Sequence, residues 1–148
     1  MIEEDIETIE SGYEYLLAFA AQGRPAQAEI GPGPHARPTI EGIAAAMKNL
    51  VTAFADSKDD FEQVIANDCR TAGAAVGFIL AQDKIGSEMV DNLNASIHLR
   101  AVLTDLFLYS EVLKPLANDE APSTEKEGAA ADNGGGVETY DPSQEKDG

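Results

Sequence analysis

The chain has 148 residues, and its 27 Asp and Glu against 10 Lys and Arg give a formal net charge of -17. This length makes one domain with one core, and the hydrophobic content of 43% is ordinary for a globular protein. The negative charge disfavours binding to nucleic acid or to an anionic membrane, because phosphate recognition needs Lys and Arg. It favours a protein partner with a basic surface, and adaptation to high salt stays open as another explanation.

The first residues have the spacing of an amphipathic helix. Acidic residues crowd the first turn, where they meet the positive end of the helix dipole. Gly23 and Pro25 predict the end of this helix. The apolar residues that form its seam at 4-3-4-3-4 spacing are Ile2, Ile6, Ile9, Tyr13, Leu16 and Ala20.

The stretch 24–38 holds four prolines and two glycines, so no regular element runs through it. We expect a long, partly extended Pro/Gly loop between the first two helices. Such a loop could cross the length of a short bundle, so these helices need not be simple antiparallel neighbours.

Three further helices are predicted after the loop. Thr39 is the expected N-cap of the second, and Ser57 with Asp60 forms a capping-box pattern for the third. Ser87 is the expected N-cap of a fourth helix that continues to about Lys114. Apolar residues at helical spacing support these helices: Ile40, Ile43, Met47, Leu50, Phe54; Phe61, Ile65, Ala72, Val76, Leu80; Val90, Leu93, Ile97, Ala101 and Leu108.

Four amphipathic helices with no alternating strand pattern predict an all-α fold, a four-helix bundle over residues 1–116. Beyond it the composition changes to small, polar and acidic residues, with three glycines at 134–136. Such a segment buries too little apolar surface to offset its ordering entropy. We therefore expect residues 117–148 to be a disordered acidic tail.

Four glutamates repeat a 4-3-4 spacing one residue after the apolar seam of the first helix. They are Glu3, Glu7, Glu10 and Glu14, and no Lys or Arg precedes Arg24. Like charges at these spacings destabilise an isolated helix by a few tenths of a kcal/mol per pair, on the order of 0.2–0.5. A basic partner would relieve that repulsion, so we take these residues as the candidate partner-binding surface, against the alternative of a solvated face.

Weaker signals for a ligand come from four other residues. His35 and Arg37 lie in the Pro/Gly loop and could contact an anion, although the prolines there remove amide donors. Asp91 and His98 lie two helical turns apart in the fourth helix. No Glu-x-x-His or His-Glu-x-x-His occurs, so we expect no metal site and no cofactor.

Cys69 is the only cysteine, and it lies inside the third helix, where we expect a structural thiol. Gly73 and Gly77 lie one turn apart in the same helix and indicate a close approach. Packing against another helix of the chain is the preferred explanation, with a homodimer seam or a flat ligand as alternatives.

The sequence therefore predicts a non-enzymatic interaction protein, such as an adaptor, assembly factor or chaperone-like module, that binds a basic partner. The alternative is a small-ligand- or metal-binding bundle, which could be an enzyme subunit, built around His35, Arg37, Asp91 and His98. No secretory signal pattern occurs, and the longest nearly apolar run, 71–81, is shorter than the roughly 20 residues of a membrane span. We expect a cytoplasmic protein.

Overall fold

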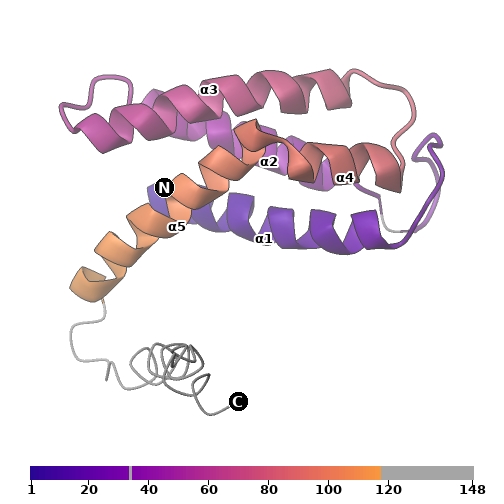
Figure 1. Ribbon diagram of the computed structural model, residues 1–148, viewed down its shortest axis with the longest axis horizontal. Helices are drawn as coiled ribbons and strands as arrows, with labels where there is room; N and C mark the ends of the chain where they lie inside the picture. Colours follow the sequence, from indigo (N-terminus) through magenta and orange to yellow (C-terminus); the bar gives the residue numbers. More distant parts are fainter. Residues whose placement is uncertain (34, 118–148) are drawn as a thin grey trace, which may run out of the picture. The chain divides into compact units, whose positions relative to one another are not determined.

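The computed structural model describes residues 1–33 and 35–117, with side chains described as far as residue 113. This part of the chain is all-α, with no strand (Figure 1). The chain divides into two compact units, Met1–Val112 and Leu113–Gly148, and the fold below is that of the first. The helices are α1 (Ile2–Ala21), α2 (Arg37–Ala53), α3 (Asp60–Leu80), α4 (Ser87–Ala95) and α5 (Ile97–Ala117).

The predicted tail lies outside the described residues from residue 118 onward. Among the helices that are described, none is both long and apolar enough to cross a membrane.

α1 follows the predicted pattern and packs against both α2 and α4. It ends at Ala21, and Gly23 follows with a φ of +68°, a conformation that L side chains rarely adopt. A Cβ atom on Gly12 would lie 2.8 Å from Cγ1 of Ile43. The missing side chain at Gly12 therefore lets α1 lie close to α2, and the two helices are direct neighbours despite their long connection.

The start of α2 differs from the prediction of a Thr39 cap. The helix begins at Arg37, because Pro38 fits its first turn and a loop carboxylate supplies the cap. Glu29 accepts hydrogen bonds from the backbone N–H of Ala36 and, at 2.8 Å, from that of Arg37. The cap comes from seven residues upstream, which a search for local capping patterns does not reach.

The N-cap of α3 is Asp59, two residues later than the predicted Ser57. Asp59 Oδ1 accepts hydrogen bonds at 2.9 Å from the backbone N–H groups of Phe61 and Glu62. Ser57 instead donates its hydroxyl to Oε1 of Glu62, at 2.6 Å. An aspartate before the helix competes effectively with a serine for this position.

The single helix predicted from Ser87 onward is two helices, α4 and α5. The backbone is extended at Ser96, with φ -60° and ψ 132°, and its Oγ accepts a hydrogen bond from the N–H of His98 at 3.1 Å. Asn94 is buried and donates from Nδ2 to the carbonyl of Leu16 in α1 at 3.1 Å. Ser96 ends α4 and its hydroxyl pairs with a backbone N–H of the first turn of α5, while Asn94 ties the end of α4 to α1.

Ser87 does not cap α4 with its side chain. Its Oγ donates to the carbonyl of Phe19 at 2.7 Å and accepts from the N–H of Arg24 at 2.8 Å. Gly86 is the N-cap. The buried hydroxyl of Ser87 thus joins the end of α1 to the start of α4.

The first part of the α1–α2 loop packs on the segment that joins α3 to α4. Ile85 donates its N–H to the carbonyl of Gln27 at 3.1 Å, and Ser87 donates to the carbonyl of Arg24 at 2.9 Å. These backbone hydrogen bonds hold the first part of the loop against a segment that is distant in the sequence.

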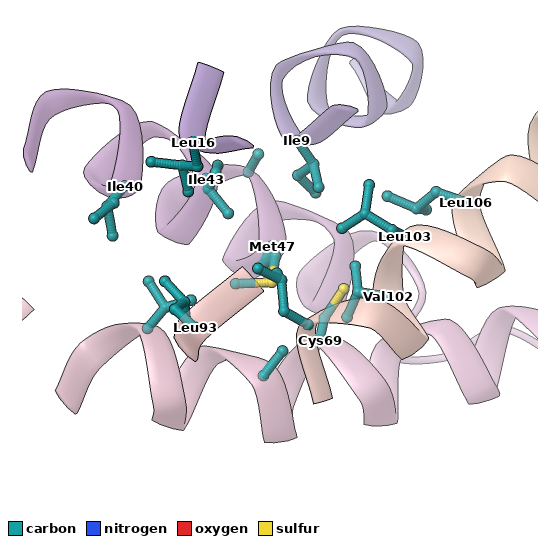
Figure 2. Packing of buried hydrophobic residues seen from close by; sticks show 14 of the residues in the cluster. Ile9, Leu16, Ile40, Ile43, Met47, Cys69, Leu93, Val102, Leu103 and Leu106 are labelled. Atoms are coloured by element: carbon teal, nitrogen blue, oxygen red, sulfur yellow. The ribbon is translucent and has the colours of Figure 1, made fainter. Parts of the chain in front are cut away.

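All five helices contribute to one apolar core. Figure 2 shows side chains from each helix meeting there, among them Leu16, Met47, Cys69, Leu93 and Leu106. Each of these five is less than 5% exposed. Two large apolar residues of α5, Phe107 and Leu108, lie outside this core and are 52% and 57% exposed.

Candidate functional site

Four glutamates of α1 lie along one flank of its buried seam, each one residue after a seam residue. Glu3, Glu7 and Glu14 are exposed, while Glu10 is half-buried and already has an interaction partner. We call these four residues the α1 acidic face. They share this flank because α1 is one continuous helix and burial of its apolar seam fixes its rotation.

The N-terminal end of this face continues onto other helices. The hydroxyl of Tyr109 in α5 donates to Oε2 of Glu62 in α3 at 2.5 Å. Burial raises the pKa of Tyr109 above its ordinary value, and the neighbouring carboxylates Glu62, Asp59 and Glu3 raise this pKa further. We call Glu3, Asp59 and Glu62 around Tyr109 the acidic junction.

The position of Tyr109 is fixed by aromatic packing as well as by its hydrogen bond. Its ring centroid lies 5.7 Å from that of Phe54, in an edge-on arrangement, and 6.5 Å from that of Phe61. The spacing of residues along the sequence does not indicate this junction. The available signal was the acidic start of α3, but only the fold brings it near Glu3.

The side chain of Arg37 makes hydrogen bonds within the fold. Its Nη1 donates to the carbonyl of Leu80 at 2.8 Å, and its Nη2 donates to the carbonyl of Gln82 at 2.6 Å. Its Nε lies 3.9 Å from Oε1 of Glu29. The guanidinium therefore satisfies carbonyl groups at the C-terminal end of α3, which is a favourable place for a cation.

His35 also serves the loop. Its Nε2 lies 2.8 Å from the carbonyl oxygen of Gly31, and its own carbonyl accepts a hydrogen bond from the hydroxyl of Tyr15 at 3.1 Å. These contacts hold the turn before α2, and they leave His35 and Arg37 with separate structural partners.

Asp91 and His98 are both exposed, Asp91 in α4 and His98 in α5. The bend at Ser96 lies between them, so the spacing expected for one continuous helix does not apply. Within the described part of the chain, no three His, Cys, Asp or Glu side chains come together in a way that could hold a metal ion.

A carboxyl pair lies between α3 and α5. Oδ2 of Asp105 is buried and lacks a hydrogen-bond partner among the described residues. Burial raises the pKa of Asp105 to about 7, and the neighbouring carboxyl group of Asp68 raises this pKa further. The neighbouring thiol of Cys69 is buried, and burial together with Asp105 and Asp68 raises its pKa to about 12, so it is a structural thiol and a poor nucleophile.

The pair predicts a specific dependence of stability on pH. The pKa of Asp105 rises on folding from 3.8 to about 7, so the folded state binds more protons than the unfolded state between these values. The contribution of Asp105 to stability is therefore present at low pH and is lost as the pH rises through 7.

We expect Asp105→Asn, which keeps the shape without the charge, to raise the free energy of unfolding at pH 8 by about 1 kcal/mol, allowing for solvent screening. At pH 4 the effect should be close to zero. Urea denaturation of both proteins at the two pH values measures this difference, and a destabilised variant at pH 8 would contradict the assignment.

No protein-family model, curated protein or solved structure matches this chain.

Proposed function

We propose that the protein is a non-enzymatic interaction module, of the adaptor, assembly-factor or chaperone-like kind, which binds a basic partner. Its binding surface is the α1 acidic face together with the acidic junction. The observation that carries this proposal is the convergence of carboxylates from α1 and α3 around Tyr109, next to a row of exposed glutamates.

Electrostatics supports a basic partner for this surface. Like charges held close together on a folded surface repel one another, and a cationic partner converts that repulsion into attraction. Glu7 and Glu14 extend from one helix, which sets the spacing of their backbone positions for a partner. Such a surface favours fast, salt-dependent association.

The alternative, a ligand or metal site, has less support. Arg37 is already occupied by α3 and Glu29, and the bend at Ser96 lies between Asp91 and His98. These contacts favour the interaction module over a site built from those four residues.

The test compares two double charge reversals with the same change in net charge. Glu7→Lys with Glu14→Lys alters the α1 acidic face, and Glu41→Lys with Asp91→Lys alters exposed residues elsewhere. We expect the α1 variant to bind a fluorescein-labelled decalysine peptide about tenfold more weakly than the wild type, since reversing two exposed charges changes the free energy by about 1–2 kcal/mol.

The affinity of the control variant should fall by less than about threefold, because its substitutions change only the net charge of the protein. Fluorescence anisotropy at 0.15 M NaCl measures both affinities. Equal losses in the two variants would show that net charge alone attracts the peptide, and the proposed surface would then be wrong.

A further inference from the structure

A groove lies between α2 and α3, which pack side by side. It encloses about 440 Å³ and opens to solvent, since Lys48, Arg70 and Gly77 are exposed. Its lining is mostly apolar or small: Ala44, Met47, Lys48 and Val51 from α2, and Cys69, Arg70, Gly73 and Gly77 from α3.

The two glycines keep this groove open. A Cβ atom on Gly73 or Gly77 would meet no described atom within 4 Å. The expected close approach to another helix of the chain is therefore wrong for the described residues. Glycine weakens a helix interior, and here no packing within this part of the chain compensates for it.

The charged side chains that line the groove are basic, although Asp68 and Asp105 lie near Cys69 at its base. No Asp or Glu occurs from residue 42 to 55 or from 69 to 82, although the whole chain contains 27. Lys48 on α2 and Arg70 on α3 line the groove, and neither forms an ion pair with a described carboxylate. Arg70 donates a hydrogen bond from Nη1 to a neutral group, Oδ1 of Asn67, at 2.6 Å.

We propose that this groove docks an amphipathic helix of a partner protein whose apolar stripe is flanked by carboxylates. The segment from Ala44 to Val51 covers about two helical turns, roughly 10 Å, which matches the contact length of a crossing helix. Small residues on α3 allow a helix backbone to approach closely, and Lys48 and Arg70 are placed to meet its acidic flanks.

This surface is separate from the α1 acidic face and takes a partner of opposite charge. The proposal does not depend on the proposed function above, and its test uses different residues.

Two synthetic helical peptides of 18 residues serve as probes. Both have an apolar stripe of Leu and Ala, flanked by Glu in one peptide and by Lys in the other. Titration into ¹⁵N-labelled full-length protein at 0.15 M NaCl is followed by amide chemical shifts, because screening at this salt leaves local charges dominant over the net charge.

We expect the Glu peptide to shift amides of Ala44, Lys48, Gly73 and Gly77, and the Lys peptide to leave them unchanged. Net charge alone predicts the reverse preference, since the chain carries -17. Groove amides that do not shift with the Glu peptide at millimolar concentration would overturn the proposal. Shifts at these amides that depend on protein concentration alone would assign the groove to a second copy and would also overturn it.

Two variants test how the Glu peptide is held. Lys48→Glu with Arg70→Glu should weaken its binding at least tenfold. Gly77→Leu should fill the groove and abolish binding while the fold is retained, because its Cβ meets nothing.

Ala18→Leu adds a comparable apolar side chain on the exposed side of α1 and should leave binding unchanged. Unchanged binding by a folded Gly77→Leu protein would place the peptide elsewhere and contradict the proposal.

Discussion

Replacing Gly86 with alanine is expected to lower the free energy of unfolding by about 3 kcal/mol, through overpacking and the loss of one or two buried backbone hydrogen bonds. A Cβ atom on Gly86 would lie 2.6 Å from the backbone N of Ala26 and 2.8 Å from the backbone C of Pro25. Backbone cannot move aside as a flexible side chain does. The α1–α2 loop must shift, which breaks the hydrogen bonds that Gln27 and Arg24 accept from Ile85 and Ser87.

Gly73→Ala is the matched control for this substitution. Its Cβ meets no described atom within 4 Å. The free energy of unfolding should therefore rise by about 1 kcal/mol, because alanine has a higher helix propensity than glycine. Urea denaturation monitored by circular dichroism measures both variants. A neutral Gly86→Ala would show that the loop does not lie against the start of α4 as described.

Arg37→Ala is the second substitution with a large expected effect. The half-buried guanidinium donates to two carbonyl groups at the end of α3, and its removal leaves both without this partner. We expect the free energy of unfolding to fall by about 2–3 kcal/mol, which is the range for charge-assisted hydrogen bonds in a partly buried setting.

Arg100→Ala provides the comparison, because this arginine is exposed on α5 and should change stability by less than about 0.5 kcal/mol. Arg37→Lys should recover only part of the loss, since an ammonium group lacks the planar fork that reaches two carbonyls. Equal stability of the Arg37→Ala and Arg100→Ala proteins would contradict the structural role of Arg37 and return it to the ligand hypothesis.

The all-α class and most helix positions could be predicted from the sequence, because apolar periodicity depends on residues close together in the chain. The start of α2 and the bend between α4 and α5 could not. Glu29 caps α2 from within the loop, and Asn94 is drawn to a carbonyl of α1. Both effects depend on segments that meet only in the folded chain.

Of the candidate surfaces, too, some parts could be predicted from the sequence and others could not. The α1 acidic face was readable because Glu3, Glu7 and Glu14 follow one helical repeat. Its continuation to Glu62 through Tyr109 was not, since it joins three helices. The glycines of α3 were noticed from the sequence, but their assignment to intrachain packing was wrong, because spacing does not tell which side of a helix its neighbours occupy.

The two surfaces differ in the sign of their charge, which the net charge of the chain does not reveal. Carboxylates gather on α1 and at the start of α3, while the α2–α3 groove carries Lys48 and Arg70. The two proposed surfaces would let one molecule hold two different partners at once, which suits the proposed adaptor role better than that of a carrier of a single ligand.

The most direct test of the α1 acidic face as a partner surface is quantitative co-purification from the protein's source cells, with native mass spectrometry of the recovered complexes. Tagged wild-type protein, the Glu7→Lys/Glu14→Lys variant and the Glu41→Lys/Asp91→Lys variant are compared. We predict that a protein with a basic surface is recovered with the wild type and the control variant and is lost with the α1 variant. Recovery of the same protein with all three would contradict the account.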